Sequence, residues 1–153
     1  MSSDFDKMVD QMQEEILDDM KKVYSKEVIK LFLHPKNVGE IKDAEGCGKF
    51  TGPCGDTMEI YLKVKDDRIL DAMFMTDGCG TTLACGSTVT SLCKDKTIPG
   101  AMHITSKDIL NKLGGLPEAD VHCSVLAANT LKKAIKNYLD EGKDAWKIFY
   151  RKR

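Results

Sequence analysis

An alternating segment in the middle of the chain limits the possible folds most strongly. Every second residue from 58 to 64 is apolar, and the residues between them are charged or aromatic. This period of two predicts a strand with one buried face. A turn-like Asp66-Asp67-Arg68 follows, and the segment ILDAMFMT then continues as the partner strand of an antiparallel hairpin.

The segments around this hairpin have helical or short-strand patterns. Residues 44–51 predict a short strand, and helices are expected at 4–24, at 24–33 before His34-Pro35, and at 81–94. Thr105-Ser106-Lys107-Asp108 resembles a capping box that opens a short helix ending at Gly114-Gly115. A last long helix starts near His122, and its expected buried stripe is Leu131, Ile135, Tyr138 and Leu139. We read the basic, aromatic tail KIFYRKR as a solvated end with a few anchoring side chains. Strands followed by helices favour the α+β class.

The first predicted helix is acidic and carries an apolar stripe at helical spacing. The stripe consists of Phe5, Met8, Met12, Ile16, Met20 and Val23. Such a stripe predicts a helix that docks on its own domain, which is the interpretation we favour. The alternative is a helix for a partner or for self-association, because methionine suits an adaptable surface.

Length and charge exclude several classes of protein. A chain of 153 residues suits one domain with a core, and its net charge of −1 gives no basic excess for nucleic-acid binding.

The acidic N-terminal segment does not resemble a secretory signal, and no apolar run is long enough to span a membrane. The sequence therefore favours a cytoplasmic protein.

Six cysteines in such a protein point to metal or sulfur chemistry more than to disulfides. Cys54 lies in a Gly/Pro-bounded loop before a strand, Cys79 between a strand and a helix, and Cys123 at the start of the last helix. Helix starts favour negative charge, and the thiolate is the form that binds metals. Three sulfurs could converge here, with Asp56 and His122 as further ligands.

The remaining cysteines and histidines have other expected roles. Cys47, Cys85 and Cys93 lie in a strand or inside a helix and are expected to be structural, although Cys85 could approach the site. No C-x₂-C pair marks a zinc ribbon. His34 and His103 are expected at the surface. His122 and Cys123 are neighbours on a helix and should point to different sides, so His122 is expected to be a ligand or to handle protons.

Four motifs in this order, HPKNVG, PCGDTM, DGCGTT and HCSVLA, resemble the U-type iron–sulfur cluster scaffold family, which comprises IscU and the N-terminal domain of NifU. The resemblance covers about Tyr24 to Leu139. It implies a small, three-stranded antiparallel sheet covered by helices, with an extra N-terminal helix here. We therefore divide the chain into an extension, 1–23, and a scaffold domain, 24–153.

The resemblance also implies roles for residues, cofactors and partners. The family's ligand cysteines are matched by Cys54, Cys79 and Cys123. Asp56 matches the aspartate that keeps the cluster labile, and His122 matches an alternative ligand. Cys123 matches the cysteine that accepts persulfide sulfur. The cargo would be a transient [2Fe–2S] cluster built from iron, and zinc can occupy the same site. The implied partners are a cysteine desulfurase and apo iron–sulfur proteins, and a homodimer is left open. The expected role is a scaffold and not a turnover enzyme.

The sequence departs from the family pattern in four places. Leu116-Pro117-Glu118-Ala119-Asp120 replaces the family's Leu-Pro-Pro-Val-Lys, which puts an interaction with an Hsp70-type chaperone in doubt. The acidic first helix is additional, Cys85 replaces a small hydroxyl residue, and no Cys-x-x-Cys domain follows. Two alternatives stay open. One is a zinc-dependent sulfurtransferase of the SufU type, although the short interval from Cys79 to Cys123 fits the scaffold branch better. The other is a purely structural zinc module.

Overall fold

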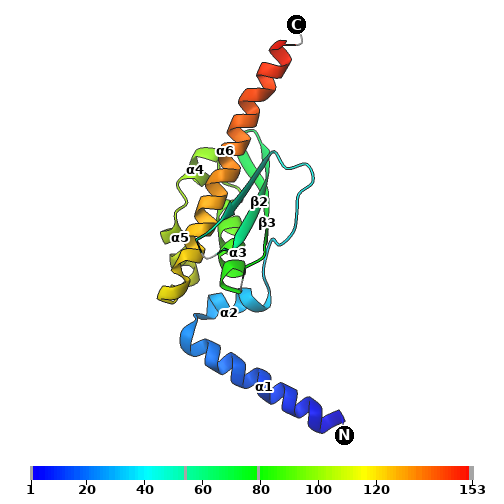
Figure 1. The fold of residues 1–153 in the computed structure, drawn as a ribbon, viewed down its shortest axis with the longest axis vertical. Coiled ribbons are helices and arrows are strands. Elements are labelled where there is room, and N and C mark those ends of the chain that lie inside the picture. The colour runs from blue at the N-terminus through cyan, green and yellow to red at the C-terminus, as the bar shows by residue number, and fades with distance from the viewer. Residues whose placement is uncertain (1, 54, 79, 152–153) are drawn as a thin grey trace.

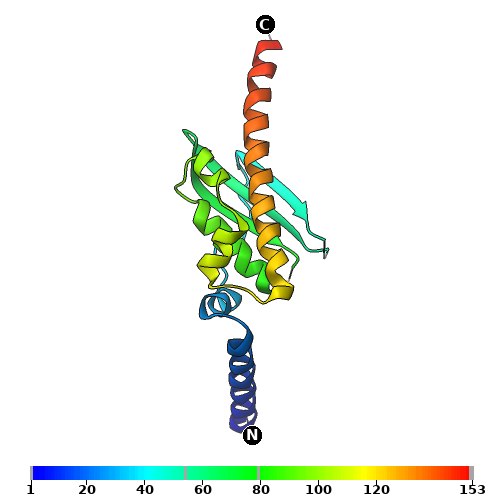
Figure 2. The ribbon, with the colours of Figure 1, turned by 90° about the vertical axis from the view of Figure 1, so that its left-hand side faces the viewer.

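The computed structural model has a three-stranded sheet with helices gathered on one face, and a helix projects from each end of this body (Figures 1 and 2). The backbone is described for residues 2–53, 55–78 and 80–151, and side chains for all of these except 2, 3, 17 and 142–151. The elements are α1 (Ser2–Val23), α2 (Lys26–Leu33), β1 (Gly46–Thr51), β2 (Thr57–Lys65), β3 (Arg68–Thr76), α3 (Gly80–Cys93), α4 (Ile98–Met102), α5 (Ser106–Leu113), the 3₁₀ turn η1 (Glu118–Asp120) and α6 (Val121–Arg151). The predicted α+β class is confirmed.

The sheet has the order β1-β2-β3, and both pairs of strands are antiparallel. Its central strand buries alternate residues, as the period of two predicts. Asp66 and Asp67 form the turn to β3 with φ angles of 55° and 58°. Positive φ at both central residues is the geometry of a two-residue hairpin turn whose twist matches that of the strands. The predicted hairpin is therefore confirmed, except that Arg68, which was predicted in the turn, is the first residue of β3.

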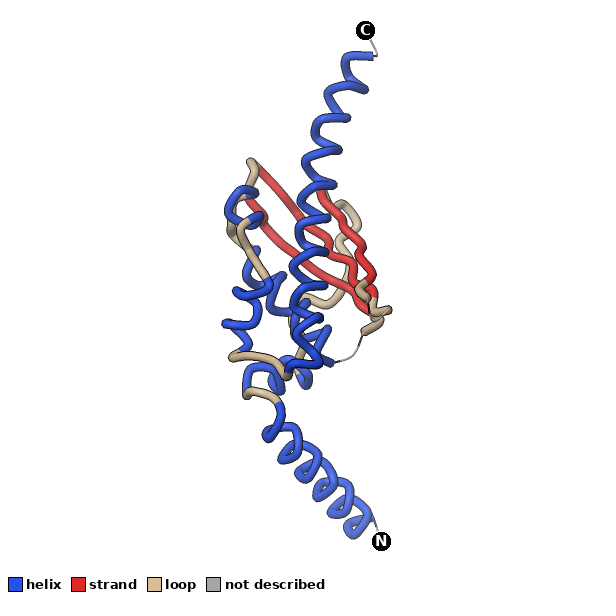
Figure 3. Tube along the Cα trace, turned by 60° about the vertical axis from the view of Figure 1, so that its left-hand side comes forward, coloured by secondary structure: helices blue, strands red, loops and turns tan. Residues whose placement is uncertain are grey.

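Two glycines allow helices to approach the sheet closely. A Cβ atom at Gly48 of β1 would overlap the backbone of Ala134 in α6, and one at Gly86 of α3 would overlap the ring of Phe74 in β3. α6 therefore runs directly over β1, and α3 lies against β3 (Figure 3). These two contacts set how closely α3 and α6 lie against the sheet.

The helix ends follow the local signals in the sequence. Ser25 caps α2 by accepting a hydrogen bond from the amide of Val28 at 3.2 Å. At the predicted capping box, the carboxylate of Asp108 accepts a hydrogen bond from the amide of Thr105 at 2.9 Å. Gly114 ends α5 with φ of 78°. Two short elements, α4 and η1, were not predicted from the sequence.

The last helix differs from its prediction at one residue of its stripe. Leu131 and Ile135 are fully buried and Tyr138 is partly buried, but Leu139 is 41% exposed, so its assignment to the buried stripe is wrong. At this point α6 has begun to extend beyond the sheet, and its helical backbone continues to Arg151 (Figure 2). The predicted anchoring side chains of the tail lie outside the described residues.

The predicted docking of the first helix on its own domain is wrong. α1 leaves the body beyond α2, and the described side chains of its stripe are largely exposed, between 54% and 63% at Phe5, Met8, Met12, Ile16 and Val23 (Figure 1). The helix is rooted where the hydroxyl of Tyr24 donates a hydrogen bond to Asp120 at 3.1 Å. α1 packs on α2 at this root, and its described apolar side chains point largely into solvent. Among the helices described, none is long and apolar enough to cross a membrane.

Candidate metal centre

Three segments far apart in the sequence meet at the end of the body from which α1 leaves. They are the loop before β2, the start of α3 and the start of α6 (Figures 1 and 3). α2 lies beside the start of α3, because a Cβ atom at Gly80 would lie 3.0 Å from the Phe32 ring. Within the described residues, this end holds the group Asp56, His122 and Cys123, whose ligand atoms all lie within 4.8 Å of one another. A carboxylate oxygen, an imidazole nitrogen and a thiol sulfur can together hold iron or zinc.

A tight turn places Asp56 at this end. The amide of Gly52 donates to the carbonyl of Asp56 at 2.8 Å, and the amide of Gly55 donates to the carbonyl of Gly52 at 3.0 Å. Gly55 has φ of 92°, a conformation that residues with a side chain rarely adopt. Asp56 is therefore presented by a closed loop at the entrance to β2.

The starts of β2 and α3 are held together by a second set of hydrogen bonds. The carboxylate of Asp77 accepts from the amide of Thr57 at 2.8 Å. The hydroxyl of Thr76 donates to the carbonyl of Thr57 at 2.7 Å and accepts from the amide of Gly78 at 3.0 Å. These bonds fix the distance between Asp56 and the first turn of α3.

The first turn of α6 supplies the other two groups. Cys123 is the third residue of the helix and is 1% exposed, whereas His122 is partly exposed. Nε2 of His122 lies 3.6 Å from Sγ of Cys123. The prediction that these side chains point to different sides is wrong, because the imidazole ring swings back over the helix start toward the sulfur.

A threonine that sequence reasoning missed joins two members of this group. Thr82 in the first turn of α3 is fully buried. Its Oγ1 donates to Oδ2 of Asp56 at 3.2 Å and lies 3.5 Å from Sγ of Cys123. The one signal in the sequence is its place in the motif DGCGTT, at the expected start of a helix.

The comparisons with known proteins show the family of the chain. The family model described as NifU-like N terminal domain matches residues 23–145. The chain belongs to the NifU-like N-terminal domain family. It is 48% identical over 117 residues to the iron-sulfur cluster assembly scaffold protein IscU 1 of Archaeoglobus fulgidus, and the match covers 76% of each chain. It is 44% identical over 119 residues to the iron-sulfur cluster assembly scaffold protein IscU of Aquifex aeolicus, with the same coverage.

The fold is also found among solved structures. A putative iron-sulfur cluster assembly scaffold protein for the SUF system from Fervidobacterium islandicum AW-1 superposes with a TM-score of 0.59. The match covers 73% of this chain and 96% of the other, at 22% sequence identity. At this identity the likeness shows that the two proteins share the fold.

Two of the predicted sulfur ligands of the NifU-like domain, Cys54 and Cys79, lie outside the described residues. The convergence of three sulfurs stays a prediction. The segments that carry them are described on both sides, and Asp56 and Thr82 from those segments contact each other.

The other predicted cysteines of the NifU-like domain differ in exposure. Cys85 and Cys93 are fully buried, as a structural role requires. Burial raises the pKa of Cys93 to about 12, and its Sγ donates to the carbonyl of Thr90 at 3.3 Å. Cys47 is instead exposed on β1, so a role as a buried apolar residue is wrong for it. His34 and His103 are exposed, as predicted.

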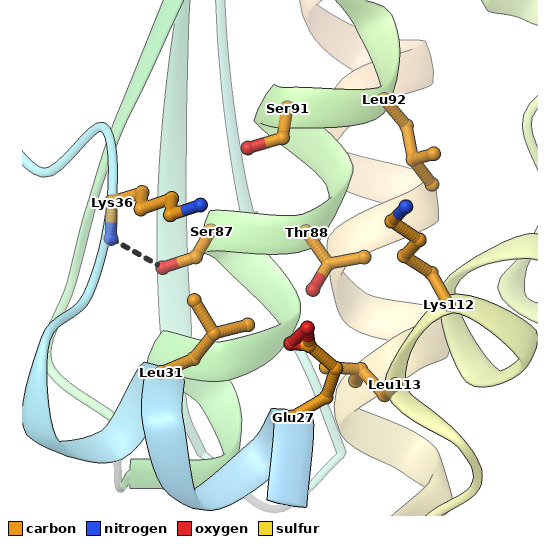
Figure 4. A pocket seen from close by; sticks show the side chains of 9 residues that line it. All are labelled: Glu27, Leu31, Lys36, Ser87, Thr88, Ser91, Leu92, Lys112 and Leu113. Atoms are coloured by element: carbon orange, nitrogen blue, oxygen red, sulfur yellow. Dashed lines mark hydrogen bonds between the residues drawn. The ribbon is translucent and has the colours of Figure 1, made fainter.

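A hollow separate from the metal centre of the NifU-like domain lies between α2, α3 and α5 (Figure 4). Glu27, Lys36 and Lys112 surround it, and the amide of Lys36 donates to the hydroxyl of Ser87 at 3.0 Å. Neither Asp56 nor Cys123 lines this hollow, so it forms no part of the candidate metal centre.

Proposed function

We propose that this protein is a scaffold on which iron–sulfur clusters are built and from which they pass to apo-proteins. The observation that carries the proposal is the meeting of Asp56, His122 and Cys123 within 4.8 Å at one end of the fold. Membership of the NifU-like family and the scaffold names of its relatives support it. The cargo is a [2Fe–2S] cluster held by Cys54, Cys79, Cys123 and Asp56, with His122 as an alternative ligand. We assign this role to residues 24–153 and treat residues 1–23 as an extension.

Asp56 gives the site the property that a scaffold needs. Thiolates are soft ligands that hold cluster iron firmly, whereas a carboxylate is harder and holds it less tightly. A permanent electron carrier uses four cysteines. A site with one carboxylate corner therefore suits a protein that must release what it binds.

Cys123 is the proposed acceptor of sulfur from a cysteine desulfurase. Its thiolate attacks the outer sulfur of the donor's persulfide, a new S–S bond forms on Cys123, and the donor cysteine leaves as a thiolate. This exchange needs no external oxidant. His122, with Nε2 at 3.6 Å from the sulfur, is placed to take the proton of the thiol before the attack.

The same donor atoms also suit tetrahedral zinc, so a zinc-dependent sulfurtransferase is the second candidate. That function requires stoichiometric zinc that survives purification and catalytic stimulation of a desulfurase without cluster formation. A protein in which zinc has a purely structural role would instead unfold when the zinc is chelated, and it would accept no sulfur. The three candidates therefore differ in measurable behaviour.

Anaerobic reconstitution tests the scaffold. The protein is incubated with iron, cysteine, a thiol reductant and catalytic desulfurase, and absorption and Mössbauer spectra are recorded. We expect a [2Fe–2S] spectrum that Cys123→Ser abolishes and the matched control Cys93→Ser retains. Persulfide mapping by mass spectrometry after a single turnover should find the added sulfur on Cys123. Sulfur mainly on Cys47 would overturn that assignment, and no cluster in the parent protein would overturn the scaffold.

A further inference from the structure

Thr82 occupies a place in the metal centre that none of the ligand roles explains. Its hydroxyl lies between the carboxylate of Asp56 and the sulfur of Cys123, although these residues are 26 and 41 positions away in the sequence. Fully buried hydroxyls normally bond to a nearby backbone carbonyl in a helix, as Thr88 does with Ala84 at 2.8 Å. Thr82 contacts the two candidate ligands.

The position of this hydroxyl is constrained from several sides. The residue is fully buried in the first turn of α3. A Cβ atom at Gly78 would lie 2.7 Å from Thr82 Oγ1, so the chain preceding α3 packs against it closely. A β-branched side chain also has few rotamers on a helix. The hydroxyl therefore has little freedom to move away from Asp56.

We propose that Thr82 is a positioning residue that acts on the metal through Asp56. A carboxylate accepts hydrogen bonds only, so Thr82 donates its proton to Oδ2 and holds that oxygen toward the buried side of the site. The second oxygen of Asp56 is then the one presented to a metal ion. Without the hydroxyl, the Asp56 side chain, which is only partly buried, is free to rotate toward solvent.

The inference rests on the proposed function only in requiring that Asp56 and Cys123 bind a metal ion. The test uses Co²⁺ and the metal-free protein, with no desulfurase and no cluster. Titration gives the dissociation constant. The sulfur-to-cobalt charge-transfer band reports thiolate binding, and the loss of intensity in Cys123→Ser assigns the share of Cys123. Thr82→Val removes the hydroxyl while keeping the shape, Thr82→Ser restores it, and Thr88→Val is the matched control on the same helix.

We expect Thr82→Val to weaken Co²⁺ binding on the order of tenfold, the size of one hydrogen bond to a charged group. The charge-transfer band of Thr82→Val should stay close to that of the parent. Thr82→Ser and Thr88→Val should bind Co²⁺ with a dissociation constant close to that of the parent. In an Asp56→Ala background, Thr82→Val should have little further effect, because its partner is gone. Circular dichroism checks the fold, and Thr82→Ala replaces Thr82→Val if the latter does not fold.

Two kinds of failure can be told apart. If Asp56→Ala and Cys123→Ser bind Co²⁺ as the parent does, the proposed metal site is wrong. If those variants are weakened but Thr82→Val binds as the parent does, the site stands and the role of Thr82 is overturned. Additive effects of Thr82→Val and Asp56→Ala, or a failure of serine to rescue, would also overturn it.

Discussion

Nε2 of His122 lies 3.6 Å from Sγ of Cys123, although the two residues are neighbours on one helix. The imidazole belongs to the exposed side of the site and the sulfur to its buried side. An imidazole, a group that can accept a proton near neutral pH, thus lies beside the candidate sulfur acceptor and is itself reached by solvent. This relationship leads to the first prediction.

His122→Ala should slow sulfur transfer to Cys123 by about 100-fold, the lower range for loss of a positioned proton acceptor. The measurement is single-turnover transfer from a persulfide-loaded desulfurase, followed by mass spectrometry. His103→Ala removes an exposed histidine away from the site and should transfer at the parent rate. An unchanged rate in His122→Ala would show that its imidazole takes no part in the transfer.

Asp56→Ala should leave the fold intact and make the bound cluster longer-lived, because the carboxylate is the weakest corner of the proposed site. We expect the transfer of the cluster to an apo-ferredoxin to become several-fold slower. The absorption of the acceptor measures this rate. Lability is a rate, so slower cluster transfer is compatible with weaker equilibrium binding of Co²⁺. Transfer as fast as that of the parent would remove Asp56 from this role.

Cys85→Ser should reconstitute the same cluster spectrum, with the same stoichiometry, as the parent. Cys85 is fully buried in the core, and it does not belong to the group of described ligand atoms around Cys123. Placing a hydroxyl there should lower the free energy of unfolding by about 1 kcal/mol, which denaturant titration measures. A lost or altered cluster in a variant that is folded by circular dichroism would instead make Cys85 a ligand.

Gly48→Ala should destabilise the protein by about 3 kcal/mol, because the added methyl group would overlap the Ala134 backbone, which has no rotamer by which to give way. Urea unfolding followed by circular dichroism measures the change. Gly52→Ala is the control, since its methyl group would lie 3.6 Å from the nearest atom, in Leu126, which is ordinary contact. Equal stability of the two variants would mean that α6 and β1 can move apart at little cost.

The sequence predicted those parts of the fold whose causes are local. The period of two in β2, the two aspartates of its turn and the capping box before α5 each act over a few residues, and each is found in the structure. The sequence also indicated that Asp56 lies at a strand entrance and Cys123 at a helix start, whereas their meeting at one end was implied by the family resemblance alone.

What the sequence did not reveal depends on contacts between distant segments or on side-chain rotation. The stripe on α1 has the period of a docked helix, but a period does not say what covers the face, and most of this face is exposed in the structure. The rule that neighbours on a helix diverge applies to Cβ directions, and the long imidazole of His122 overcomes it. The partners of Thr82 lie in two other elements, which a single sequence does not pair.

The two ends of the molecule differ in a way that bears on how it can be handled. The candidate metal centre lies at the end from which α1 departs, and the far end of α6 lies at the opposite pole (Figure 1). An affinity tag or a surface linker at the C-terminus therefore leaves the metal centre facing solution. The same linker at the N-terminus would hold that face toward the support, so immobilised binding assays should be oriented through α6.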